Sequence, residues 1–248
     1  MKVNRKLDIL KYKGIIFDRD GTLFDSNGVM SNADDKLIHV LGAKLRQPIP
    51  DEWADFYRNF TGNEDISLVW AKHLINIYNL ESITPERYLE NRNTILNDII
   101  RILPYKEDAD KLLLMLKNIG ISLAMVTLGS DNSMELYHHN EIINATAPIN
   151  LIFNNNIITS DFVKLKNLRQ KPEPDPNLLA LKMLGLRPEE CLVFEDSLIG
   201  LISAQRAGID TCIIYDSHSD KDREELERGT PYHINNFSEL FEYSNFDF

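Results

Sequence analysis

Five short apolar runs, each nearly continuous rather than alternating, place the strongest constraint on how this chain can fold. They are GIIF (14–17), ISLAMVT (121–127), NLIF (150–153), CLVFE (191–195) and DTCIIY (210–215). Continuous apolar runs of this length are typical of strands that are buried on both faces, as in a parallel sheet. We therefore expect these five runs to form strands in the interior of an α/β fold.

Amphipathic segments lie between these runs and can supply the crossover helices that a parallel sheet needs. EDADKLLLMLKNIG (107–120) has a leucine-rich face and ends at Gly120, a residue that often follows a helix. DPNLLALKMLGL (175–186) has Asp175 as the expected N-cap and Gly185 at its end. This alternation predicts a doubly wound, Rossmann-like parallel sheet with helices on both faces.

About a hundred residues separate the first two predicted strands, far more than a simple crossover requires. Helical patterns with start signals at Asn32, Asp51 and TPE (84–86), and no convincing strand, occupy this segment at 32–45, 51–60, 66–79 and 84–101. We therefore predict an α/β core made of residues 1–26 and 103–248 and an inserted α-helical cap made of residues 27–102. A module inserted after the first strand can cover a site at the carboxyl edge of the sheet.

Charge and composition exclude several classes of partner. The net charge of -11 at pH 7 argues against nucleic acid or an anionic membrane surface as the main partner. The apolar stretches are shorter than the ~20 residues of a membrane span, and MKVNRKLDILKYKG at the start lacks the apolar segment of a secretory signal. Cys191 and Cys212 lie in apolar runs, which favours buried free thiols. We expect a cytoplasmic protein, and the sequence makes no prediction of its oligomeric state.

Four polar features occur in order along the chain, three of them at the carboxyl ends of predicted strands and one in a connection that leads into a helix. DRDGT follows the first strand, Thr127 closes the second, and Glu195 and Asp196 end the run CLVFE, while Lys171 lies in KPEPD ahead of a helix. Because the carboxyl ends of parallel strands meet at one edge, these side chains can converge on one crevice. Carboxylates, a hydroxyl and an ammonium together suit a hard divalent cation and a phosphate.

These residue types can together transfer a phosphoryl group. Asp18 can attack phosphorus and form an aspartyl phosphate. Mg²⁺ bridging Asp18, Asp196 and a phosphate oxygen can offset the repulsion between the two anions. Asp20 can protonate the leaving oxygen and then deprotonate the attacking water. Lys171 and Thr127 can hold the phosphoryl oxygens.

In order and spacing, the segments DRDGT, VT, KPEPD and FEDSLIGLISAQRAG resemble the four motifs of the haloacid dehalogenase superfamily. The likeness is to its helical-cap branch, which includes phosphatases and β-phosphoglucomutase-like enzymes, and it covers about residues 14–215. It implies that Asp18 is the nucleophile and that Asp20 is the acid/base, with its backbone carbonyl also on Mg²⁺.

The same resemblance implies roles for the later motifs. Thr127 and Lys171 would hold the phosphoryl group, and Asp196 would complete the metal site with Glu195 in or near it. Arg19, between the two acids of DRDGT, occupies a position that is usually apolar in this branch, and the sequence does not indicate what it contacts.

Three details separate the reactions of this superfamily. A dehalogenase expels halide, which needs no protonation, and such members typically lack the second acid, here Asp20. Mutases of the β-phosphoglucomutase type typically have a His five positions after Asp25, where this chain has Met30. They also tend to have an Arg after the cap glycine, whereas TGNEDIS (61–67) has acids there that would repel a second phosphate.

We therefore predict a Mg²⁺-dependent phosphatase that hydrolyses a small phosphomonoester, a small phosphorylated metabolite, through an aspartyl-phosphate intermediate. A sugar-phosphate mutase of the β-phosphoglucomutase type stays open, as does a catalytically silent relative that acts as a binding or regulatory module. The aromatic residues of the insert recur at helical spacings, which favours a role in the cap core over a substrate platform; they are Trp53, Phe56, Tyr57, Phe60 and Trp70.

Overall fold

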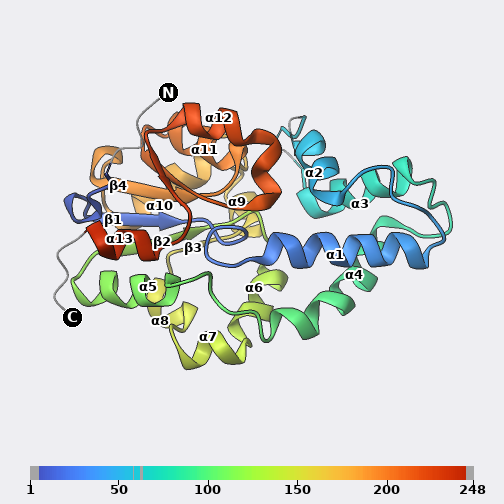
Figure 1. The fold of residues 1–248 in the computed structure, drawn as a ribbon, viewed down its shortest axis with the longest axis horizontal. Helices are drawn as coiled ribbons and strands as arrows, with labels where there is room; N and C mark the ends of the chain where they lie inside the picture. The colour runs from blue at the N-terminus through green and yellow to red at the C-terminus, as the bar shows by residue number, and fades with distance from the viewer. Residues whose placement is uncertain (1–5, 58, 62–63, 244–248) are drawn as a thin grey trace.

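The computed structural model describes residues 6–57, 59–61 and 64–243, and these residues form an α/β fold around a parallel sheet (Figure 1). The strand order is β3-β2-β1-β4-β5-β6, and every neighbouring pair is parallel. The strands are β1 (Gly14–Phe17), β2 (Ser122–Val126), β3 (Ile157–Ile158), β4 (Cys191–Glu195), β5 (Asp210–Ile214) and β6 (Tyr232–Ile234). The predicted fold class, a parallel-sheet α/β core, is confirmed.

Successive side chains of the central strands enter two different hydrophobic clusters, one on each face of the sheet. On β1, Ile15 and Phe17 pack into one cluster and Ile16 packs into the other, as the two-residue period of a strand requires. Burial on both faces explains why these strands have continuous apolar sequences. The helices around the sheet are η1 (Ile9–Lys11), α5 (Ala109–Asn118), α6 (Asp131–His138), α7 (Glu141–Ala145), α8 (Ile149–Phe153), α9 (Ser160–Leu165), α10 (Asp175–Leu184), η2 (Pro188–Glu190), α11 (Leu198–Arg206), η3 (Ser217–Asp222), α12 (Arg223–Gly229) and α13 (Ser238–Tyr243).

The central strands end level with one another, and this places the site. Phe17, the last residue of β1, pairs with Met125 of β2 on one side and with Phe194 of β4 on the other. The residues that follow these three strands therefore leave the sheet side by side at its carboxyl edge.

One predicted strand is wrong. Residues 150–153 belong to α8, and the strand that pairs with β2 is the two-residue β3 that follows. Ile149, Ile152 and Phe153 are the buried residues of α8, a spacing that gives one face of a helix. A run of apolar residues as short as this one is compatible with a helix or a strand. The helix is followed directly by a turn at Asn154, whose φ is 51°.

Several helix boundaries also differ from those predicted. The insert helices begin at Ser26 rather than Asn32 and at Ile49 rather than Asp51. Asp175 is the first residue of α10 rather than its N-cap, and its carboxylate accepts a hydrogen bond from the Arg169 backbone N–H at 2.9 Å. The start at Thr84 is confirmed, because its hydroxyl accepts from the Arg87 N–H at 3.3 Å.

The described residues of the segment 27–102 contain helices and no strand. These helices are α1 (Ser26–Val40), α2 (Ile49–Tyr57), α3 (Ile66–Ile77) and α4 (Pro85–Ile100), and they share a hydrophobic cluster of their own around Trp70 and Tyr88. In Figure 1 they lie beyond the arrowhead of β1, on the side where the strands end. The exact division into a core and a cap stays a prediction.

Two connections join this helical segment to the sheet, and they lie side by side. Phe24 and Tyr105 form an antiparallel bridge, and their rings stack with centroids 4.6 Å apart. The Tyr105 hydroxyl donates to the carbonyl oxygen of Ala147 at 2.6 Å. None of the helices in the described part of the chain has both the length and the apolar character that a membrane crossing requires.

Candidate active site

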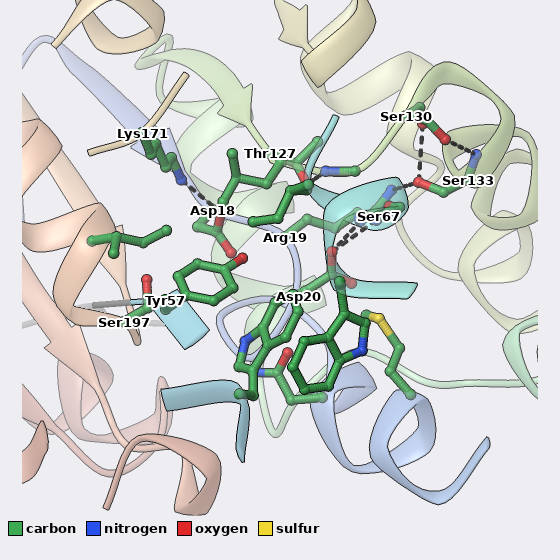
Figure 2. Close-up of a pocket in the computed structure, with 18 of the residues that line it drawn as sticks. Asp18, Arg19, Asp20, Tyr57, Ser67, Thr127, Ser130, Ser133, Lys171 and Ser197 are labelled. Atoms are coloured by element: carbon green, nitrogen blue, oxygen red, sulfur yellow. Dashed lines mark hydrogen bonds and ion pairs between the residues drawn. The ribbon is translucent and has the colours of Figure 1, made fainter. Parts of the chain in front are cut away.

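Lys171 lies at the centre of the polar cluster at the carboxyl edge of the sheet. Its buried ammonium donates to Asp18 Oδ1 at 2.7 Å, to Glu195 Oε1 at 2.5 Å and to the carbonyl oxygen of Val126 at 2.9 Å. Figure 2 shows the lysine pointing toward Asp18. These three acceptors stand at the ends of β1, β4 and β2, so one side chain ties together the ends of the three central strands.

Three carboxylates gather around this one ammonium. Asp18, Glu195 and Asp196 each offer an oxygen, and these oxygens all lie within 4.8 Å of one another. Burial raises the pKa of Asp18, and the negative charges of Glu195 and Asp20 raise it further. The positive charge of Lys171 lowers the pKa, but the pKa of Asp18 still lies above its ordinary value. Burial, Asp216 and Asp18 likewise raise the pKa of Asp196. The cluster is short of positive charge.

Hard oxygen donors in this arrangement fit a divalent cation of the Mg²⁺ type. Glu195 is already well supplied with protein donors, because besides Lys171 it accepts from the Ser197 hydroxyl at 3.0 Å and from the Asp196 backbone N–H at 3.2 Å. Asp196 accepts only from the side chains of Thr22 and Asn27, both at 3.1 Å, among the described residues. Asp18 and Asp196 are therefore the carboxylates best able to bind a cation, and Glu195 mainly anchors Lys171.

Two glycines allow this close packing. Gly21 has a φ of 79°, and a Cβ there would overlap the Asp196 carboxylate. Gly200, in the first turn of α11, lies so close to Glu195 that any side chain would displace that carboxylate. Only glycine satisfies both the left-handed backbone and the close approach at position 21.

Arg19 pairs with Asp20, a contact that sequence reasoning did not find. The guanidinium donates to Asp20 Oδ2 through Nη2 at 2.7 Å and through Nε at 3.0 Å. Asp20 Oδ1 also accepts from the hydroxyls of Ser26 at 2.6 Å and Tyr137 at 3.0 Å. Burial raises the pKa of Asp20, but Arg19, Ser26 and Tyr137 together hold its pKa below the ordinary value.

The Arg19 side chain is almost fully enclosed. Its Nη1 donates to the Ser133 hydroxyl at 2.9 Å, and its guanidinium lies 4.5 Å from the centroid of the Tyr137 ring. Figure 2 shows it between Asp20 and Ser133. A Cβ at Gly129 would overlap the guanidinium, so the turn after β2 makes room for this residue. The unusual Arg in DRDGT thus neutralises Asp20 inside the protein.

Thr127 lies where the sequence predicts it, directly after β2, and lines the same cavity as Asp18. Its hydroxyl oxygen accepts from the Gly129 N–H at 3.0 Å. Because a hydroxyl also carries one proton, Thr127 can still donate to an anion in the cavity. All the predicted site residues therefore converge; they are Asp18, Asp20, Thr127, Lys171 and Asp196.

A cavity of about 790 Å³ lies between the carboxyl edge of the sheet and the helices of the insert. Met30, the position at which mutases have a His, is one of its lining residues. Asp65 of TGNEDIS also lines it, caps α3 by accepting from the Leu68 N–H at 3.1 Å and pairs with Lys164 at 2.7 Å. Gly62 and Asn63 of the same segment lie outside the described residues.

The aromatic residues of the insert do more than the sequence indicated. They pack on one another, but Trp53, Tyr57, Phe60 and Trp70 also line the cavity. Figure 2 shows the Tyr57 ring directed toward Asp18. Burial, followed by the charges of Asp18 and the neighbouring acids, raises the pKa of Tyr57 well above its ordinary value. Helical spacing could not distinguish a residue that packs from one that also faces the cavity.

A catalytic site at the carboxyl edge of a parallel sheet, with buried acids around one lysine, is typical of an α/β enzyme. A family model described as haloacid dehalogenase-like hydrolase matches residues 12–208. The chain therefore belongs to the haloacid dehalogenase-like hydrolases, as its four motifs indicated, and it is a hydrolase of that family.

Named relatives and solved structures agree with this family. Hexitol phosphatase A of Escherichia coli is 32% identical over 200 residues, which cover 80% of this chain and 81% of the relative. Protein CbbY of Rhodobacter capsulatus is 31% identical over 211 residues, 81% and 84% of the two chains.

Among solved structures, CbbY from Rhodobacter sphaeroides in complex with xylulose-(1,5)bisphosphate matches with a TM-score of 0.68 at 21% identity, covering 92% of this chain and 95% of that chain. β-Phosphoglucomutase from Clostridium difficile matches with a TM-score of 0.64 at 18% identity, covering 94% and 96%. At these identities the structures show the shared fold.

The buried pair between Arg19 and Asp20 generates a prediction about stability. Arg19→Met leaves a buried carboxylate without its cation and is expected to lower the free energy of unfolding by about 3–5 kcal/mol. In a double-mutant cycle with Asp20→Asn, we expect a coupling free energy of about 1–3 kcal/mol. Urea unfolding in the presence of a chelator gives the free energy of unfolding of the wild type, the two single variants and the double variant.

The exposed pair Arg87–Glu90, with a 2.6 Å contact on α4, is the matched control. Its cycle, with Arg87→Met and Glu90→Gln, is expected to show coupling below about 0.5 kcal/mol. Additive effects of Arg19→Met and Asp20→Asn would contradict the assigned pairing.

Proposed function

We propose that the protein is a Mg²⁺-dependent phosphatase that hydrolyses a small phosphomonoester through an aspartyl phosphate on Asp18. The observation that carries this proposal is the cluster of Asp18, Asp196 and Glu195 around the buried Lys171 ammonium. The names of relatives support it, since the Escherichia coli relative is a hexitol phosphatase and one from Psychrobacter arcticus is a phosphoglycolate phosphatase.

In this proposal an Asp18 oxygen attacks phosphorus, and the phosphoryl group passes to the carboxylate. The Lys171 ammonium and the Thr127 hydroxyl hold the phosphoryl oxygens, because both can donate into the cavity. Asp18, Asp196 and the backbone carbonyl of Asp20 would bind Mg²⁺. When bound there, the cation supplies the positive charge that lets a carboxylate approach a phosphate.

Asp20, which Arg19 holds in its ionised form, would take up a proton once that contact is released, donate it to the leaving oxygen and then accept one from the water that hydrolyses the intermediate. Its two oxygens accept hydrogen bonds from Arg19, Ser26 and Tyr137, so it must exchange at least one of these partners to reach a substrate. Ser26 is the first residue of α1. We take residues 27–102 as a cap over a core of 1–26 and 103–248, which makes Ser26 the last core residue before the cap. A movement of the cap that carries α1 with it would shift Ser26 at the start of that helix and loosen its contact with Asp20.

The alternatives have weaker support. A mutase of the β-phosphoglucomutase type would need a group to hold a second phosphate, and Met30 and Asp65 in the cavity provide none. A silent binding module does not explain why Lys171 bonds Asp18 at 2.7 Å while oxygens of Asp18, Glu195 and Asp196 lie within 4.8 Å of one another. The buried free thiols of Cys191 and Cys212 support the proposed cytoplasmic location.

Activity tests the proposed function directly. The protein is expected to hydrolyse acetyl phosphate and p-nitrophenyl phosphate with Mg²⁺ but not with a chelator present. Asp18→Asn should lower kcat on the order of 10⁴-fold or more, because it removes the nucleophile. Its melting temperature is not expected to fall, because the change relieves repulsion among buried acids.

Glu189→Gln is the control for this test, since Glu189 lies in η2 at the amino end of β4, away from the acid cluster. It should retain full turnover. Turnover that persists in Asp18→Asn would rule out the assigned nucleophile, and no turnover by folded wild-type protein with either substrate would rule out the phosphatase.

Metal binding has a readout that is independent of turnover. Mg²⁺ at 100 times its Kd would stabilise the folded state by about 2.7 kcal/mol, which raises the melting temperature of a chain of this size by roughly 5–10 °C. Asp196→Asn should lose most of this rise, because it removes one of two carboxylate ligands. Differential scanning fluorimetry measures the melting temperatures. An equal Mg²⁺-induced rise in wild type and in Asp196→Asn would place the metal elsewhere.

A further inference from the structure

We propose that the alcohol part of the substrate carries an uncharged heteroaromatic ring, as a nucleoside 5′-monophosphate does. This inference rests on the proposed phosphatase function and assigns its substrate class. The cavity extends from the acid cluster into the helices of the insert, and its volume of about 790 Å³ exceeds what a phosphoryl group alone would occupy.

Four of the residues that the insert contributes to the wall are aromatic; they are Trp53, Tyr57, Phe60 and Trp70. Trp53 lies 4.2 Å from Tyr57 and 4.7 Å from Trp70 between ring centroids, and the two indoles meet at 86°. Phe60 lines the cavity beside them. Aromatic side chains offer π-faces to a flat ring, and such stacking accepts any base because every base has a π-face.

The same cavity contains polar groups suited to the edge of such a ring. Asn93 and Asn97 are one turn apart on α4, both line the cavity, and their side-chain amides make no hydrogen bond to the described residues. An amide donates and accepts at once, which matches the paired donors and acceptors on a heterocycle. Apolar side chains complete the walls; they include Met30, Ile66, Leu89, Leu96 and Leu136.

The charges of the cavity argue against an anionic leaving group. Among the described residues, its lining contains six aspartates but only three arginine or lysine side chains. Each of these cations is already paired, as Arg19 is with Asp20, Lys171 with Asp18, and Arg92 with Asp34 at 2.7 Å. A carboxylate or a second phosphate on the substrate would therefore meet repulsion without a free cation to bind it.

Tyr57 connects the aromatic wall to the reacting end. It follows Trp53 by four residues on α2, so the two rings share one face of that helix. Its hydroxyl makes no hydrogen bond within the described part of the chain, and Figure 2 shows it directed toward Asp18. The hydroxyl can therefore donate to a substrate oxygen while the neighbouring Trp53 ring contacts the base.

A comparison of phosphomonoesters tests this inference. We expect kcat/KM for nucleoside 5′-monophosphates to exceed that for phosphoglycolate, fructose 1,6-bisphosphate, phosphocholine and glycerol 3-phosphate by about tenfold or more, the size of a base-stacking contribution. Acetyl phosphate, which has no ring, serves as the reference substrate for the acid cluster.

Trp53→Leu is the diagnostic variant. It should lower the ratio of kcat/KM for the nucleotide to kcat/KM for acetyl phosphate by about tenfold, mainly through KM. Phe56→Leu is its matched control, because Phe56 belongs to the same aromatic cluster, 5.6 Å from Trp53, but does not line the cavity. Phe56→Leu should keep the wild-type ratio, and thermal melts of both variants report on folding.

The outcomes separate this inference from the function on which it rests. The assigned substrate class would be overturned, with the phosphatase left standing, by a kcat/KM for any of the four substrates without an aromatic ring that equals or exceeds that for the nucleotides. An equal change of the ratio in Trp53→Leu and Phe56→Leu would have the same meaning. If folded protein hydrolyses neither acetyl phosphate nor any compound of the panel, the phosphatase itself is overturned.

Discussion

The buried ammonium of Lys171 is the interaction on which the arrangement of the site depends. It reaches Asp18, Glu195 and the carbonyl of Val126, and so joins the ends of β1, β4 and β2. Without it, carboxylates within 4.8 Å of one another would be buried with no compensating charge, at a cost of several kcal/mol. The level register of the central strands brings these groups to one place, and the lysine keeps them there.

Asp20, the other acid of DRDGT, is paired with a different cation, Arg19. Asp18 shares Lys171 with Glu195, and the pKa of Asp18 lies above its ordinary value, whereas Arg19 keeps the pKa of Asp20 below it. Two carboxylates two positions apart therefore occupy distinct environments. These shifts favour the neutral form of Asp18 and the ionised form of Asp20, so the proposed roles require a bound cation beside Asp18 and release of the Arg19 contact from Asp20. Ser26 and Tyr137 add to the Arg19 contact and connect Asp20 to α1 and to α6.

The pattern of apolar residues along the sequence predicted the central strands, but the sequence did not predict the contacts that individual side chains make. The central strands β1, β2 and β4 were predictable because burial on both faces demands continuous apolar runs. The apolar run at 150–153 became α8 because its letters fit either structure, and β6 was missed because YHI is short and polar. Convergence of the acids with Lys171 followed from strand ends meeting at one edge. The partners of Arg19 and the inward orientation of Tyr57 depend on α6 and α2, which no local pattern relates to the strand ends.

The proposed reaction passes through a phosphorylated Asp18, and chemical trapping of that species can detect it. Wild-type protein with Mg²⁺ would be mixed briefly with acetyl phosphate and reduced with borohydride, which converts an acyl phosphate to an alcohol. Peptide mass spectrometry would then locate the change. We expect homoserine at position 18, formed only when substrate is present. Modification at another residue, or an unmodified Asp18 while phosphate is released, would contradict it.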